Sequence, residues 1–88
     1  MWVEQSEYIV VGAALAAARE RARLTQQEIA RRLRKPQSFV SSYELGQRRV
    51  DILELFRIVE ALSCDPIEIV EDIMHRAKVP IRRRRSRV

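Results

Sequence analysis

The sequence predicts an all-α fold of five short helices, and three observations support this prediction. Apolar residues recur at intervals of three and four along most of the chain, which is the spacing of one face of an α-helix. Three helix starts carry an Asp or a Thr followed three residues later by a glutamate. No stretch alternates apolar and polar residues for long enough to indicate a strand. With 88 residues, the chain has room for one small domain.

The first helix is expected over residues 9–22, which are rich in alanine, the residue with the highest helix propensity. Its inner face is expected to comprise Val11, Leu15, Ala18 and Ala22. The second helix begins at Thr25, which matches a capping box with Glu28. The inner face of this helix is expected to comprise Ile29, Ala30 and Leu33.

The third helix, over residues 36–45, follows a tight basic turn. It starts near Pro36, where the missing N–H of proline costs little, and Gly46 can adopt the left-handed conformation that closes a helix. Val40 and Tyr43 should anchor it, with Phe39 beside them.

The fourth and fifth helices are predicted to begin at capping boxes of Asp51 with Glu54 and of Asp65 with Glu68. Pro66 suits the first position of the fifth helix. The apolar stripe of the fourth helix is Leu55, Ile58, Val59 and Leu62, and that of the fifth is Ile67, Val70, Ile73 and Met74. A domain is therefore expected over residues 8–78, followed by a disordered arginine-rich tail over residues 79–88.

Positive charge is concentrated in two segments of a chain whose formal net charge is +5. Residues 19–49 carry nine Lys or Arg against three glutamates, and residues 82–88 carry five arginines and no acid. The other segments are net acidic. This distribution favours a polyanionic partner, although arginine-rich helices also occur as solvated surfaces.

The outward face of the third helix is polar, as a helix that reads DNA in the major groove must be. Its outward residues include Gln37, Ser38, Ser41 and Ser42. Glutamine can pair bidentately with adenine, so Gln37 is the sharpest candidate for contact with a base; the serines could instead contact phosphate or water. Such side chains can also be merely exposed to solvent.

The segments V-G-A-A-L-A-A-A-R, L-T-Q-Q-E-I-A-R-R-L, P-Q-S-F-V-S-S-Y-E-L-G and L-F-R-I-V-E-A-L together cover about residues 11–72. In this order and spacing the chain resembles the lambda-repressor-like, Cro-type helix-turn-helix family, also called the xenobiotic-response-element (XRE) family. The resemblance implies base contacts by Gln37, Ser38 and Ser42, with Ser41 nearby. It also implies phosphate contacts by Gln26, Arg48 and Arg49, a structural ion pair between Arg19 and Glu44, and a close helix crossing at Ala30.

One position departs from the family pattern. The family usually has a left-handed glycine in the turn between the second and third helices, and this chain has Arg34. A non-glycine residue there costs roughly 1 kcal/mol or more, unless the turn is shaped differently. Arg34 and Lys35 are therefore candidates for phosphate contact from an exposed turn.

The sequence offers little to a catalyst or a metal. The only histidine, His75, has no second ligand at a metal-binding spacing, and the single Cys64 excludes an internal disulfide and fits a reducing compartment. No phosphate loop or triad can be assembled, so neither a cofactor nor enzyme activity is expected. The acidic start and the lack of a long apolar run predict a cytoplasmic protein. The family resemblance implies a bacterial or phage-type regulator that associates with the nucleoid through DNA binding.

The expected function is sequence-specific binding of double-stranded operator DNA, with repression of transcription, by a homodimer on a near-palindromic site. Helix five and the apolar residues Trp2, Val3, Tyr8 and Ile9 are candidate dimer surfaces. The alternative is an antitoxin or another protein-interaction module in which DNA binding is secondary. The tail could be a DNA-binding arm, an RNA- or protein-binding segment, or a solubilising end.

Overall fold

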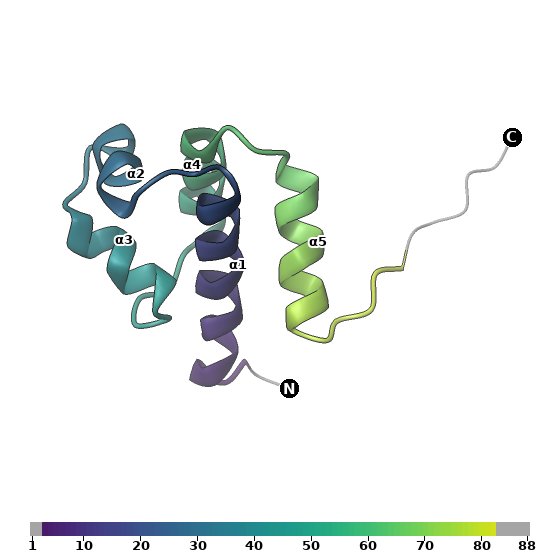
Figure 1. The fold of residues 1–88 in the computed structure, drawn as a ribbon. Coiled ribbons are helices and arrows are strands. Elements are labelled where there is room, and N and C mark those ends of the chain that lie inside the picture. Colours follow the sequence, from purple (N-terminus) through teal and green to yellow (C-terminus); the bar gives the residue numbers. More distant parts are fainter. Residues whose placement is uncertain (1–2, 83–88) are drawn as a thin grey trace, which may run out of the picture.

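The computed structural model describes residues 3–82 and confirms the predicted all-α class. A 3₁₀ turn, Gln5–Glu7, precedes the first α-helix. The α-helices are α1 (Tyr8–Arg21), α2 (Gln26–Leu33), α3 (Gln37–Glu44), α4 (Ile52–Leu62) and α5 (Pro66–Arg76) (Figure 1). No strand occurs within residues 3–82. Residues 79–82 have no regular secondary structure; Trp2 and most of the predicted tail, residues 83–88, lie outside the described residues.

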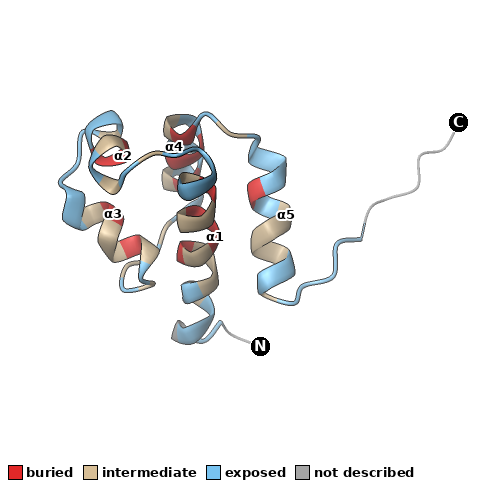
Figure 2. Ribbon diagram, viewed as in Figure 1, coloured by how far each residue is buried: buried red, intermediate tan, exposed pale blue. Residues whose placement is uncertain are grey.

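Helix α1 lies at the centre of the fold. It packs against α3 on one side and α5 on the other, while α2 packs against α3 and α4 (Figure 1). Buried apolar residues occur in all five α-helices (Figure 2). They are Ala14, Leu15, Ala18, Ile29, Ala30, Val40, Tyr43, Leu55, Ile58, Val59, Leu62 and Ile69. The predicted stripe of α4 is confirmed in full.

Two of the three predicted capping boxes form. At α2, Glu28 N–H donates to Thr25 Oγ1 (3.1 Å) and Thr25 N–H donates to Glu28 Oε1 (3.0 Å); Asp51 and Glu54 make the equivalent pair at α4. At α5 the prediction is wrong in one respect. Asp65 accepts a hydrogen bond from Ile67 N–H (2.9 Å), and no reciprocal bond from Glu68 completes a box.

Two predicted inner faces need correction. Ala22 is exposed because α1 ends at Arg21, one residue earlier than expected. In α5, Ile67 and Val70 are exposed, whereas Ile69 is 1% exposed. The helix packs through Ile69 and Ile73, one helical turn apart, so the buried stripe is rotated from the predicted one.

Candidate nucleic-acid interface

The turn between α2 and α3 has the shape that the family pattern requires, although it lacks glycine. Arg34 is left-handed, with φ +57°, and its N–H donates to the last carbonyls of α2. Lys35 N–H donates to Ala30 O (2.9 Å), which closes the turn. Ala30 itself is buried. Arg34 therefore takes the place of a glycine at a cost of about 1 kcal/mol, and its side chain is exposed.

Helix α3 is held by two side chains on its inner face. Val40 and Tyr43 are almost fully buried, and burial raises the pKa of the Tyr43 hydroxyl, which stays neutral. The Phe39 ring meets the Tyr43 ring edge-on, with 5.7 Å between centroids. Pro36 is the N-cap residue, so α3 begins at Gln37. These contacts leave the opposite face of α3 free for another molecule.

The structure places the four candidate base-reading residues on α3, and their exposure differs. Gln37 and Ser38, in the first turn, are exposed, whereas Ser41 and Ser42 are half-buried. The amino-terminal end of α3 therefore projects its polar side chains furthest from the core.

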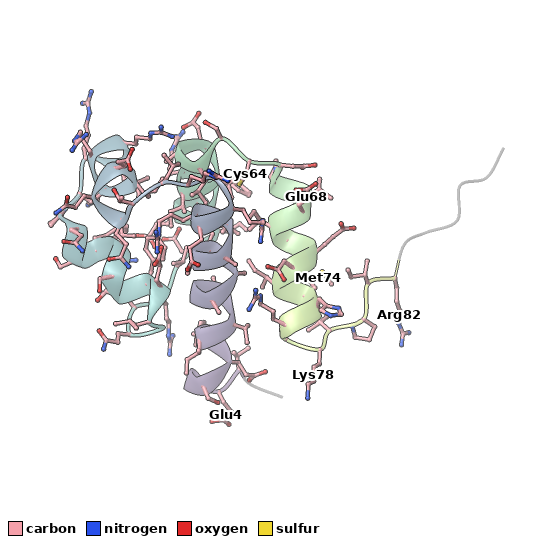
Figure 3. The ribbon with its side chains drawn as sticks, in the orientation of Figure 1. Glu4, Cys64, Glu68, Met74, Lys78 and Arg82 are labelled. Atoms are coloured by element: carbon pink, nitrogen blue, oxygen red, sulfur yellow. The ribbon has the colours of Figure 1, made fainter. Side chains whose placement is uncertain are left out.

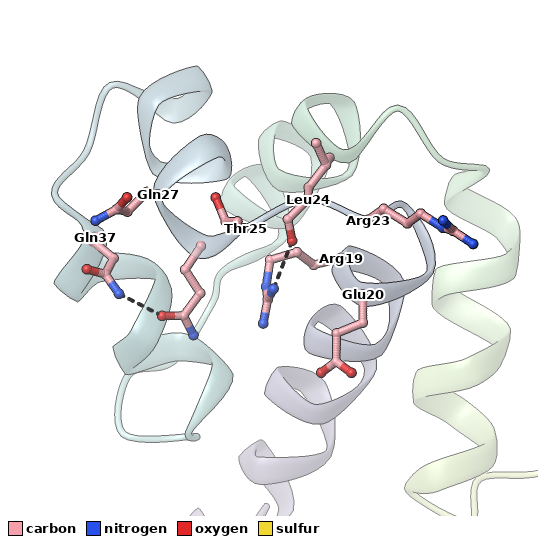
Figure 4. Close-up of a pocket in the computed structure, with 8 residues that line it drawn as sticks. Arg19, Glu20, Arg23, Leu24, Thr25, Gln27 and Gln37 are labelled. Atoms are coloured by element: carbon pink, nitrogen blue, oxygen red, sulfur yellow. Dashed lines mark hydrogen bonds between the residues drawn. The ribbon is translucent and has the colours of Figure 1, made fainter.

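Four side chains from α1, α2 and α3 form a continuous chain of hydrogen bonds. Arg19 Nε donates to Glu44 Oε2 (2.7 Å), and Arg19 Nη2 donates to Glu44 Oε1 (3.1 Å). Gln26 Nε2 donates to Glu44 Oε1 (2.8 Å), and Gln37 Nε2 donates to Gln26 Oε1 (3.0 Å). The bond from Gln37 is the dashed line in Figure 4 that ends at the unlabelled glutamine. The ion pair implied by the family resemblance is present, but the two glutamine links were not anticipated.

The ion pair in this chain is largely shielded from water. The side chains of Arg19 and Glu44 are 16% and 6% exposed. The hydrogen bond that Arg19 donates to the Glu44 carboxylate raises the pKa of Arg19. Arg19 Nη1 also donates to Leu24 O (2.9 Å), so this guanidinium joins α1, the α1–α2 turn and α3 (Figure 4).

The amino-terminal end of α2 borders an open groove (Figure 4). It is lined by Arg19, Glu20, Arg23, Leu24, Thr25, Gln26, Gln27 and Gln37. Side-chain amides, arginines and the first N–H groups of a helix suit a phosphate group on electrostatic grounds. Gln26, the predicted phosphate contact, and Gln37, the predicted base contact, therefore lie side by side.

The candidate phosphate-binding cations are not equally free. Arg34, Lys35 and Arg49 are exposed and have no ion pair with an acid among residues 3–82. The Arg49 guanidinium nevertheless lies 4.7 Å from the centre of the Tyr8 ring, and Lys35 Nζ lies 5.6 Å from that of Phe39. Arg48 Nη2, in contrast, donates to Glu54 Oε2 (2.6 Å), and its guanidinium lies 4.6 Å from the centre of the Phe39 ring. These two contacts of Arg48 were not predicted from the sequence, because Glu54 was assigned there only to the capping box of α4.

Two remaining features bear on other kinds of site. Within residues 3–82 no cluster of His, Cys, Asp or Glu is suited to a metal, and no helix is long and apolar enough to cross a membrane. Cys64 lies in the connection between α4 and α5 (Figure 3), half-buried against the core, and burial raises the pKa of its thiol.

The fold and the polar outer face of α3 define a helix-turn-helix DNA-binding domain. The sequence signature of the HTH_3 helix-turn-helix family matches residues 15–69, more than half of the chain. The chain therefore belongs to this family, the Cro/C1-type or XRE family of regulators. Among curated protein sequences, none matches the chain.

Three solved structures resemble this one. An XRE-family like protein from Pseudomonas syringae pv. tomato is 35% identical, with a TM-score of 0.71, over 85% of this chain and 89% of that one. The restriction-modification controller protein C.AhdI from Aeromonas hydrophila is 26% identical, with a TM-score of 0.66, over 73% and 97%. The clp gene regulator ClgR from C. glutamicum is 23% identical, with a TM-score of 0.75, over 80% and 91%, and shows the fold alone.

Proposed function

We propose that this protein is a sequence-specific regulator that binds double-stranded operator DNA and represses transcription. The observation that carries the proposal is the anchored helix α3, whose exposed first turn presents Gln37 and Ser38 beside the groove at the start of α2. A helix of this kind fits the major groove, where each base pair presents a distinct pattern of donors and acceptors. Repression requires only that bound protein occludes the promoter.

The proposed contacts fall into two groups. Base edges are contacted by Gln37, Ser38, Ser41 and Ser42, of which the two exposed residues of the first turn reach furthest. Phosphates are contacted by Gln26, Arg34, Lys35, Arg48 and Arg49. Arg48 makes the weakest contribution to this group, because Glu54 and Phe39 already hold its guanidinium.

We further propose that the protein acts as a homodimer on a near-palindromic site. One domain carries one recognition helix and reads half of such a site, and a second copy places its helix one DNA turn away. The described part of the arginine-rich tail, up to Arg82, leads from α5 away from α2 and α3 (Figures 1 and 3). A contact of Arg82 with DNA would therefore lie outside the groove that α3 of the same protomer occupies.

The test is selection of DNA fragments by the purified protein at about 0.15 M salt, where non-specific binding is weakened. Wild-type protein is expected to enrich one inverted repeat, and Gln37→Ala is expected to lose or relax the preference at one base pair in each half. Gln47→Ala is the matched control, since Gln47 is exposed in the loop after α3 and has no assigned contact with DNA. Uniform binding with no enriched motif would reject the proposal.

The rival proposal is an antitoxin or another interaction module. The observation that favours it is the exposure of Ile52, Leu53 and Phe56, which lie on one face of α4. A second polypeptide that co-purifies with the wild-type chain, and that is lost with Phe56→Ser, would support this function. A chain that purifies alone and selects an operator would exclude it as the primary one.

A further inference from the structure

The chain of hydrogen bonds from Arg19 to Gln37 has a fixed direction. Glu44 is an ionised carboxylate in an ion pair with Arg19, so its oxygens only accept. The group of Gln26 that faces Glu44 must therefore be its NH₂ group, and Gln26 Oε1 is turned toward Gln37. That oxygen also only accepts, so Gln37 must turn its own NH₂ group toward Gln26.

This direction determines what Gln37 can offer to DNA. One N–H of its amide is used by Gln26, which leaves one N–H donor and the Oε1 acceptor on an exposed side chain. Adenine presents an acceptor, N7, beside a donor, the N6 amino group, in the major groove. Guanine presents two acceptors, N7 and O6, and the free oxygen of Gln37 would face one of them.

We propose that Glu44 is a positioning residue for sequence readout: through Gln26 it fixes the orientation of the Gln37 amide so that Gln37 selects adenine and rejects guanine. The proposal rests on the proposed function. Glu44 touches no base in this arrangement and acts only through the two glutamines. Without its negative charge the Gln26 amide can turn over, and Gln37 can then present both of its N–H groups to DNA, which suits guanine as well as adenine.

Two variants interrupt the series of hydrogen bonds from Arg19 to Gln37 at different residues. Glu44→Gln keeps the size of the side chain but allows either end of it to face Gln26. Gln26→Met removes the two hydrogen bonds of Gln26 and leaves the ion pair of Arg19 and Glu44 intact. This variant is therefore expected to fold even if Glu44→Gln does not. Gln47→Met is the matched control, because Gln47 is an exposed glutamine in the loop after α3, outside both this chain of bonds and the groove at the start of α2.

The measurement is the ratio of dissociation constants for operators with adenine or guanine at the base pair that Gln37→Ala identifies. Wild-type protein and the Gln47→Met control are expected to prefer adenine by about tenfold or more. Both Glu44→Gln and Gln26→Met are expected to reduce this ratio to about twofold or less. A purely structural role for Glu44 would instead weaken binding to both operators equally and leave the ratio unchanged, which would overturn the proposal.

A measurement without DNA tests the same link. In the DNA-free protein, the side-chain amide NMR signals of Gln37 are expected to shift from their wild-type positions in Glu44→Gln and in Gln26→Met, and not in Gln47→Met. Unchanged signals would overturn the proposal even if operator binding is sequence-specific. A wild-type protein that selects no motif would overturn the proposed function and the inference with it, whereas a motif with guanine preferred at this position overturns the inference alone.

Discussion

Gly12 of α1 lies directly against the main-chain carbonyl of Tyr43 in α3. A Cβ atom placed on Gly12 would lie 2.1 Å from Tyr43 O and 2.7 Å from Glu44 O, so only glycine allows this approach. The contact sets the depth at which the last turn of α3 packs on α1. The same turn carries Glu44, which Arg19 of α1 holds from the side. Backbone contact and ion pair thus fix α3 together.

Replacing Gly12 by alanine should destabilise the protein, although alanine is the better helix former. The gain in helix propensity is about 1 kcal/mol, but the added carbon overlaps main-chain oxygens that cannot move independently of α3. Overpacking of this kind typically costs about 1–3 kcal/mol. Urea denaturation of Gly12→Ala should therefore show a lower free energy of unfolding, accompanied by weaker operator binding. A more stable variant would contradict the described contact.

Replacing Arg34 by glycine should stabilise the fold and weaken DNA binding. Glycine accepts the left-handed conformation of this residue, whereas Arg34→Ala keeps the strain and serves as the control. The free energy of unfolding of the glycine variant should exceed that of the alanine variant by up to about 1 kcal/mol. If Arg34 contacts phosphate, both variants should reduce the log–log salt slope of binding by about 0.9. Equal stability of the two variants would argue against strain at this turn.

The buried face of a helix could be predicted from the sequence only where its apolar residues fit a single face. The stripe Leu55, Ile58, Val59 and Leu62 was read correctly from the apolar spacing of α4. In α5, apolar residues cover more than one face, and only packing against α1 selects Ile69.

The candidate site was predictable in its residue types rather than in its connections. The outward face of α3 followed from the motif spacing, whereas the left-handed turn was implied by the family resemblance and was left open because Arg34 replaces the glycine. The hydrogen-bonded chain through Gln26 depends on α1, α2 and α3 meeting at one point, and no local pattern encodes that meeting. The approach of Gly12 to Tyr43 was missed for the same reason, because an isolated glycine in an alanine-rich helix carries no signal of its partner.

Acid should destabilise the loop between α3 and α4 through Glu54. Hydrogen bonds from Arg48 and from the Asp51 N–H lower the pKa of Glu54 below its ordinary value of 4.5. A carboxylate with a lowered folded-state pKa contributes stability that is present above the pKa of the unfolded chain and is lost as the pH falls through the folded pKa. The free energy of unfolding should therefore decrease as the pH is lowered from about 5 to about 3.

The variant Glu54→Gln isolates this effect. It should be less stable than wild type at neutral pH, because the bond to Arg48 loses its charge, and its stability should depend less on pH in this acidic range. Glu60→Gln is the control on the same helix, since the Glu60 side chain is 75% exposed. Identical pH profiles for Glu54→Gln and wild type, measured by denaturation at each pH, would show that Glu54 makes no such contribution.

The exposed face of α4 should form the dimer interface. Ile52, Leu53 and Phe56 are 60%, 68% and 52% exposed, and three large apolar side chains within one turn mark an interaction surface. This helix follows α3 after a short loop, so a second copy packed here would bring the two recognition helices near one another on the DNA side. Phe56→Ser should shift the protein to monomers in sedimentation equilibrium.

The same variant should weaken binding to a full operator by about tenfold or more, while binding to an isolated half-site changes little. Val70→Ser tests the surface on α5 that the sequence suggested, since Val70 is 40% exposed there. It is expected to leave the dimer intact. If Val70→Ser rather than Phe56→Ser produces monomers, the interface lies on α5, and the apolar face of α4 is then left for a different protein partner.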